Sequence, residues 1–224
     1  MARFDRLAVY DAMLGQGLVP LFHHDDPTAA CDAAAALARG GARLLEFTNR
    51  GDGAILVFRE IASFLAQHHP DTILGAGSIE DDATAALFLA HGANFVVGPS
   101  FSAEVARLCN RRKLPYLPGC GTVSEIAEAE TLGVEIVKLF PAATYGPAFV
   151  KAVRGPRPWT RIMPTGGVTL AEDDLRAWFD AGVACVGIGG ELVSAARLAR
   201  GELDAIERDA AEALARIARV RGAV

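Results

Sequence analysis

The apolar residues of this chain gather in short runs, separated by longer segments with helical periodicity. Eight such runs recur about every 20 to 29 residues and are rich in residues that fit a strand covered on both faces. They are residues 18–22, 43–47, 72–76, 94–98, 114–118, 134–140, 161–165 and 183–188. This pattern predicts eight parallel strands, each followed by a helix.

Capping residues indicate where several of the intervening helices begin. Asp26 and Pro27 are typical of a helix start, and Asp52 is expected to begin the next helix. Thr122 and Thr169 are each followed three residues later by a glutamate, which predicts a capping box at both places.

Eight strand–helix units, with a further helix near residues 3–14 and another through 203–220, predict a (β/α)₈ TIM barrel with an additional N-terminal helix. No linker or low-complexity stretch divides the chain, so residues 1–224 are expected to form a single barrel domain. The alternative is an open doubly wound sheet. That fold usually has fewer strands and often carries a glycine-rich turn after its first strand, which this chain lacks.

Lys138 lies inside the apolar run 134–140, where a buried strand is expected. Side chains on a strand alternate, so Lys138 shares a face with Ile136 and Phe140. The chain has three lysines and nineteen arginines, so arginine is the more available cation. Desolvation favours the neutral form of an amine, and a neutral amine can attack a carbonyl carbon to form a Schiff base, which arginine cannot do. Lys138 is therefore a candidate nucleophile.

Glu46 and Arg50 are expected on the same rim of the barrel as Lys138, at the carboxyl ends of the strands. Glu46 has the parity of Leu44 and should face inward, while Arg50 follows in the turn and could clamp a substrate carboxylate in bidentate fashion. A carboxylate beside an imine-forming lysine can shuttle protons. The residues alone leave open a second interpretation, a structural Lys–Glu ion pair without catalysis.

Glycines cluster after the last two predicted strands, at Gly166 and Gly167 and at Gly189 and Gly190. Exposed backbone N–H groups suit an anion, and barrels often hold a phosphate at this position. Glycines also end strands for steric reasons alone, so both interpretations stay open. Ser78, after the third strand, adds a hydroxyl near the same rim.

Composition limits the ligand. Hydrophobic residues make up 51% and charged residues 22% of the chain, and the net charge is −5, which argues against nucleic acid and anionic membranes as partners. No stretch of eighteen apolar residues predicts a membrane span. The cysteines, Cys31, Cys109, Cys120 and Cys185, lack metal-site spacing and are expected as reduced thiols in the cytoplasm. A small-molecule ligand is the expectation.

The chain resembles the 2-keto-3-deoxy-6-phosphogluconate (KDPG) aldolase / 4-hydroxy-2-oxoglutarate (KHG) aldolase family of class I enzymes. The matching motifs are LVP at 18–20, EFTNR at 46–50, GAGSI at 75–79, GANFVV at 92–97, PGCGT at 118–122, VKLFPA at 137–142 and PTGGV at 164–168. They span about residues 15 to 195 and follow one another at matching strand ends.

The resemblance implies that Lys138 forms the Schiff base and that Glu46 is the general acid/base. It also implies that Arg50 binds the pyruvyl carboxylate, with Ser78 where the family often has threonine and with Thr165 helping to hold the substrate. The products would be pyruvate and an aldehyde, either glyceraldehyde 3-phosphate or glyoxylate. No metal or other cofactor is implied.

One departure from the family concerns the far end of the site. Where the family commonly has a serine after the glycines of strand eight, this chain has Gly190 followed by Glu191. A carboxylate repels a phosphate, so the aldehyde partner could be unphosphorylated. The resemblance further implies a homotrimer, for which Phe101, Trp159 and Trp178 are candidate exposed contacts.

Three other functions stay open at this point. His23 and His24 with Asp25 and Asp26 could bind the metal of a metal-dependent aldolase, although adjacent residues on an extended chain point apart. A phosphosugar isomerase or epimerase would also use glycine-rich phosphate loops. A non-catalytic metabolite-binding barrel has the same fold but little use for a buried amine.

Overall fold

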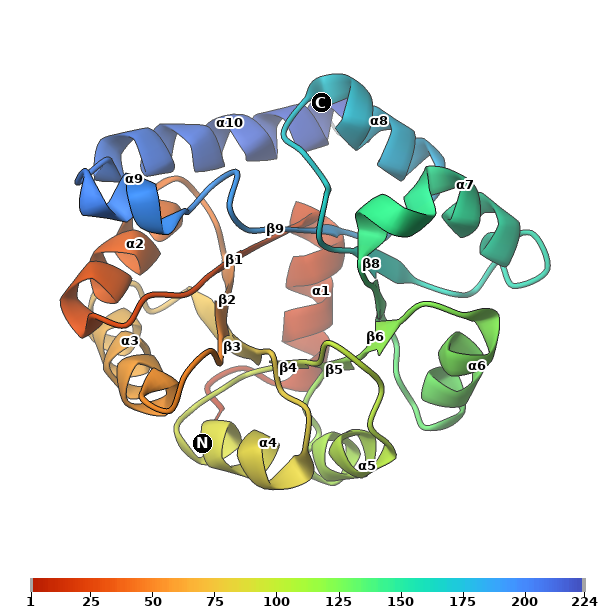
Figure 1. The fold of residues 1–224 in the computed structure, drawn as a ribbon, viewed down its shortest axis with the longest axis horizontal. Helices are drawn as coiled ribbons and strands as arrows, with labels where there is room; N and C mark the ends of the chain where they lie inside the picture. The colour runs from red at the N-terminus through yellow and green to blue at the C-terminus, as the bar shows by residue number, and fades with distance from the viewer. Residues whose placement is uncertain (1, 223–224) are drawn as a thin grey trace.

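The structure is a computed structural model that describes residues 2–222, in which parallel strands alternate with helices around a central barrel (Figure 1). The helices are α1 Arg6–Gln16, α2 Pro27–Arg39, α3 Ala54–His68, α4 Asp82–Ala90, α5 Ala103–Arg112, α6 Val123–Thr131, α7 Ala142–Arg154, α8 Glu172–Asp180, α9 Ala195–Ala199 and α10 Leu203–Val220. The strands are β1 Leu18–Phe22, β2 Leu44–Thr48, β3 Ile73–Gly77, β4 Val96–Val97, β5 Tyr116–Leu117, β6 Gly119–Cys120, β7 Val137–Leu139, β8 Ile162–Pro164 and β9 Val186–Ile188.

The strands pair in two parallel sheets, β5-β4-β3-β2-β1-β9 and β6-β7-β8, which together form the ring of the barrel. β5 and β6 lie on either side of Pro118; β5 falls within the fifth predicted strand, residues 114–118, and β6 lies beyond its end. A parallel bridge between Thr165 and Gly187 links the ends of the two sheets on the other side. The predicted (β/α)₈ barrel with its additional N-terminal helix is confirmed, with an outer ring of helices visible in Figure 1.

The strand that carries Lys138 is shorter than the sequence predicted. β7 spans Val137–Leu139 rather than residues 134–140. Val134 packs with the outer core between strands and helices, whereas Ile136 packs with the interior of the barrel. The alternation expected along the whole run therefore holds from Ile136 onwards and fails at Val134.

Helix α1 lies across the amino-terminal end of the barrel and closes it, and Figure 1 shows it behind the ring of strands. Its residues Val9 and Met13 are fully buried. They belong to an interior cluster whose strand and loop members are Val19, Leu44, Ile73, Phe95, Val97, Leu117, Ile136, Met163 and Cys185. This apolar layer fills the lower half of the barrel, so any ligand must enter from the opposite, carboxyl-terminal end.

Alternation within the strands decides which side chains reach that open end. On β2, Leu44 belongs to the interior cluster, whereas Leu45 and Phe47 pack outward against the helices. Glu46 therefore points into the barrel directly above Leu44, as the sequence predicted.

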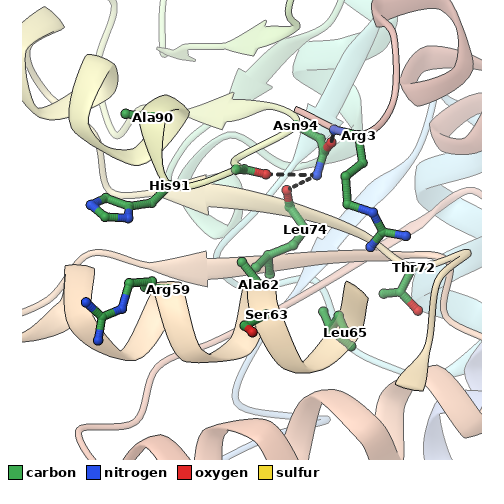
Figure 2. A pocket seen from close by; sticks show the side chains of 11 residues that line it. Arg3, Arg59, Ala62, Ser63, Leu65, Thr72, Leu74, Ala90, His91 and Asn94 are labelled. Atoms are coloured by element: carbon green, nitrogen blue, oxygen red, sulfur yellow. Dashed lines mark hydrogen bonds between the residues drawn. The ribbon is translucent and has the colours of Figure 1, made fainter. Parts of the chain in front are cut away.

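The segment before α1 is tied to the rim at the amino-terminal ends of the strands by Asn94, as Figure 2 shows. Its side-chain amide donates hydrogen bonds to the carbonyl oxygens of Leu74 and Gly92, and its oxygen accepts from the backbone N–H of Arg3 at 2.8 Å. The pocket drawn in Figure 2 lies between α3 and α4 on this rim, which is remote from the carboxyl ends of the strands.

Helix starts follow the sequence at two places and depart from it at two others. The Asp26 side chain caps α2, and Thr122 forms the expected capping box with Glu125. α3 begins after Gly53, which makes no side-chain cap, rather than at Asp52. The capping box expected at Thr169 is also wrong, because the Asp174 carboxylate engages both the N–H and the hydroxyl of Thr169, and α8 begins only at Glu172.

Trp178 is a further correction, because it is 2% exposed and packs in the outer core instead of offering a surface contact. Trp159 is 62% exposed, and Phe101 is partly buried against the core. Within residues 2–222, no helix is long and apolar enough to cross a membrane.

Replacing Phe95 with alanine is expected to destabilise the barrel by about 3–5 kcal/mol, because the fully buried ring, which packs against Gly75, would leave a cavity in the interior. The exposed Trp159→Ala should change the free energy of unfolding by only about 0.5 kcal/mol. Urea denaturation of both variants measures the difference. Equal effects of the two substitutions would contradict this account of the interior layer.

Candidate active site

A pocket of about 480 Å³ opens at the carboxyl ends of the strands. Its lining residues are Leu21, Glu46, Thr48, Arg50, Ser78, Pro99, Lys138, Phe140, Thr165, Gly166, Gly167, Val168, Thr169, Gly187, Gly189, Gly190 and Glu191. Every residue predicted for the aldolase site is in this set, whereas the candidate metal ligands at residues 23–26 are not. Residues from both ends of the chain are thus brought to one cavity by the barrel.

Lys138 occupies the middle of β7 and extends into the pocket. Its strand is flanked by β6 and β8, with Gly119 and Met163 as the partners of Lys138 in the ladders. The residue is 6% exposed, and its Nζ lies 4.8 Å from the centre of the Phe140 ring. The amine therefore lies against the ring, which covers it.

Glu46 is the most buried charged residue of the pocket, at 1% exposure. Neither carboxylate oxygen has a hydrogen-bond partner among the described residues. Burial raises the pKa of Glu46 above its ordinary value of 4.5, and the positive charges of Lys138 and Arg50 oppose this shift. A proton held on this carboxylate is available to a reacting group in the pocket.

Gly77 makes room for that carboxylate. A Cβ atom on Gly77 would lie 2.0 Å from Oε1 of Glu46, so any larger residue would displace the side chain. Gly75, the direct partner of Glu46 in the β2–β3 ladder, is needed for a different reason, since its Cβ would collide with Phe95. Gly77 therefore leaves space for the Glu46 carboxylate, and Gly75 leaves space for the Phe95 ring.

The interpretation of Lys138 and Glu46 as a structural ion pair does not fit this geometry. Both residues are buried, yet neither oxygen of Glu46 accepts a hydrogen bond from Lys138 within the described chain. Two ionisable groups buried side by side without direct pairing cost stability. Such an arrangement is typical of a site where a substrate comes between them.

The turn after β2 presents Arg50 at the pocket mouth. The Asn49 N–H donates to the Gly77 carbonyl at 2.8 Å, and the Thr48 hydroxyl donates to the Phe22 carbonyl. These bonds fix the backbone of the turn, while the Arg50 side chain is exposed. Its guanidinium is free to meet a carboxylate that enters from solvent.

Ser78 and Thr165 bring hydroxyl groups to the same cavity. Ser78 has φ 57°, a left-handed conformation that is uncommon outside glycine and concentrates at functional sites. Thr165 is 4% exposed, and its hydroxyl has no partner among the described residues. The Thr165 backbone is held by Leu139 on one side and Ala142 on the other, so the hydroxyl is positioned rigidly.

The glycine turns after β8 and β9 form the far side of the pocket. Gly166 and Gly167 have φ 83° and 102°, which L residues rarely adopt, and a Cβ on Gly167 would strike Ala143 at 2.4 Å. Gly190 borders open space. Backbone conformation and close packing therefore require glycine at both positions after β8. Glu191 adds a carboxylate to this side of the pocket.

Leu21 and Pro99 also line the pocket, and the sequence analysis missed both. Leu21 lies two residues after the inward-facing Val19 on β1, so strand alternation could have predicted that it also faces inward. Pro99 lies in a loop, where no such periodicity exists. Cys120 is not among the lining residues; it is buried in the outer core, and burial raises the pKa of its thiol to about 12.

The histidines after β1 do not form a metal site. His23 Nε2 lies 3.0 Å from Asp25, and its Nδ1 lies 3.0 Å from the Thr48 carbonyl, while Asp26 caps α2. Residues 2–222 contain no group of three or more His, Cys, Asp or Glu side chains that could hold a metal ion. The ligand set that a metal-dependent aldolase would need at this position is therefore not assembled.

Comparison with known proteins gives a consistent result. Residues 10–209 match the family model for KDPG and KHG aldolase. The chain is 36% identical to the 2-dehydro-3-deoxy-phosphogluconate aldolase of Pseudomonas aeruginosa over 91% of this chain and 90% of that protein. It is 34% identical to the KHG/KDPG aldolase of Escherichia coli over 83% of this chain and 84% of that one.

A solved structure of similar shape is the KDPG aldolase of Legionella pneumophila, in which pyruvate was captured at low pH as a covalent carbinolamine intermediate. Its TM-score is 0.81 at 27% identity, covering 90% of this chain and 96% of that one. The family model and the relatives cover most of the chain, and the solved structure has the same barrel fold. The chain belongs to the KDPG and KHG aldolase family.

Proposed function

We propose that this protein is a class I aldolase that cleaves a 2-keto-3-deoxy acid, such as KDPG or 4-hydroxy-2-oxoglutarate, to pyruvate and an aldehyde. The observation that carries the proposal is the buried Lys138 beside the buried, unpartnered Glu46 in one pocket. Family membership and the carbinolamine captured in the Legionella relative support the same chemistry.

In the proposed reaction, the Lys138 amine attacks the C2 ketone of the substrate and forms a carbinolamine. Loss of water gives an iminium, with Glu46 donating the proton that the departing hydroxyl needs. Glu46, now ionised, takes the proton of the C4 hydroxyl directly or through a water, and the C3–C4 bond breaks. The electrons of that bond pass into the iminium and give an enamine, so the aldehyde leaves and pyruvate is released after protonation and hydrolysis.

The remaining polar groups have positioning roles in this proposal. Arg50 holds the substrate carboxylate through its planar, bidentate guanidinium, and the Ser78 and Thr165 hydroxyls hydrogen-bond to the pyruvyl half. Phe140 covers the amine and limits access of water to the imine.

This arrangement favours an aldolase over the other functions that the sequence left open. An isomerase or epimerase needs acid and base groups but has no use for a lysine held beneath an aromatic ring. A binding protein would gain nothing from leaving Glu46 buried without a partner, because an unsatisfied buried carboxylate is costly.

We also infer a homotrimer in the cytoplasm. The support for the trimer is the family resemblance together with exposed apolar side chains such as Trp159 and Leu56. The support for the cytoplasm is that Cys31, Cys109, Cys120 and Cys185 are all free thiols.

Borohydride added in the presence of pyruvate is expected to trap a covalent adduct on Lys138, located by mass spectrometry of the digested protein. Lys138→Arg keeps a positive charge but cannot form an imine, so it should lose the adduct and about 10³-fold or more of the turnover. Lys151→Arg, on the exposed face of α7, is the matched control and should retain both. An adduct located on Lys113 or Lys151 would contradict the proposal.

The stability of the protein should depend on pH through Glu46. Because burial raises the pKa of Glu46, the folded chain keeps this proton after the unfolded chain has lost it. The resulting stabilisation is fully present below the ordinary value of 4.5 and is lost as the pH rises through the folded-state pKa. Glu46→Gln has no such proton, so the wild type should lose stability relative to this variant as the pH rises above 4.5.

Urea denaturation of both proteins across this range measures the difference in unfolding free energy. A difference that stays constant with pH, or one that grows in favour of the wild type, would show that Glu46 is ionised at little cost in the folded protein.

A further inference from the structure

The charged groups of the pocket are divided between two sides. Lys138, Glu46 and Arg50 come from β7 and from β2 with its following turn, and they surround the reacting end. Across the cavity, the turns after β8 and β9 contribute glycines, Val168, Thr169 and a single charged side chain, Glu191. Among the described lining residues, this far side therefore carries a negative charge and no positive one.

The donors that a phosphate would need on this side are partly engaged by the protein's own carboxylates. The Thr169 N–H donates to Asp174 at 2.7 Å, and the Thr169 hydroxyl lies 3.0 Å from the same oxygen. The next N–H, that of Leu170, points to Oε2 of Glu191 at 3.5 Å, a long and weak contact. Backbone amides of this kind are what a glycine-rich turn offers to an anion.

Nearby arginines do not neutralise Glu191. Arg197 forms ion pairs with Glu202 and Asp209, and its contacts to residue 191 and to Leu192 are with the backbone carbonyls. Arg216 pairs with Glu212 and donates to the Leu170 carbonyl. In residues 2–222, the Glu191 carboxylate forms no ion pair, and the residue lines this end of the pocket from an exposed position.

We propose that Glu191 is a specificity-determining residue that selects substrates with an uncharged, hydroxylated far end over those that carry a phosphate there. An unphosphorylated 2-keto-3-deoxy sugar acid is then the preferred substrate class. Its hydroxyl groups can donate to the Glu191 carboxylate, whereas a phosphate with nearly two negative charges is repelled by it. This inference rests on the proposed aldolase function and concerns only the half of the substrate that leaves as the aldehyde.

The test compares kcat/KM for an unphosphorylated six-carbon 2-keto-3-deoxy acid and for its 6-phosphate, with the same configuration at C4 and at low and high salt. The wild type should favour the unphosphorylated acid, and the preference should shrink at high salt because surface charges are screened. Glu191→Gln keeps the size of the side chain and removes its charge. It should raise the ratio of the phosphorylated to the unphosphorylated kcat/KM by about tenfold or more.

Glu128→Gln is the matched control, because it changes the net charge equally from an exposed position on α6, outside the pocket. It should leave the ratio unchanged. A wild-type preference for the 6-phosphate, or a ratio that Glu191→Gln does not alter, would overturn the inference.

Failure of the proposed function is distinguishable from failure of this inference. Trapping of pyruvate on Lys138 depends on the reacting end alone. If the adduct forms and the enzyme prefers the phosphorylated acid, only the role of Glu191 is wrong. If no adduct forms with pyruvate, the aldolase mechanism itself is wrong.

Discussion

Burying an amine and a carboxylate in one cavity without pairing them is the constraint on which this structure depends. Lys138 and Glu46 are both almost fully enclosed, and neither satisfies the other through a direct hydrogen bond. Each pays a desolvation cost that only surrounding structure can offset. The rest of the barrel supplies that structure: the apolar interior layer beneath, rigid parallel strands at the sides, and small residues wherever the two groups need space.

The strands hold the pocket residues in fixed relation because each one alternates between an outer apolar contact and an inner group. On β2, Leu45 and Phe47 anchor the strand to the helices while Glu46 points inward. On β3, Gly77 lets the carboxylate pass close to the backbone. Catalytic geometry and core packing are therefore consequences of the same pattern of residues, and a larger side chain at position 77 would disturb the site without touching the substrate.

Much of this could be predicted from the sequence, because period-two alternation and strand ends are local signals. These signals predicted the barrel, the inward direction of Glu46 and Lys138, and the common rim of Arg50 and Ser78, whereas the role of Thr165 was implied by the family resemblance. Two local signals were misread. Asp174 takes the donors of Thr169, so α8 begins only at Glu172, and the spacing of three between Leu175 and Trp178 could have indicated that Trp178 is buried. The absence of a partner for Glu46 is visible only when the barrel is assembled.

Lys138 and Glu46 are proposed to act together: the lysine forms the iminium that accepts the electrons, and the carboxyl group carries the proton. Exchange of the methyl protons of pyruvate for deuterium in D₂O, followed by proton NMR, tests this without any aldehyde, since exchange requires both an imine and a base. The wild type is expected to catalyse exchange, Lys138→Met none above background, and Glu46→Gln exchange that is strongly slowed. Exchange by Lys138→Met at the wild-type rate would contradict the proposed mechanism.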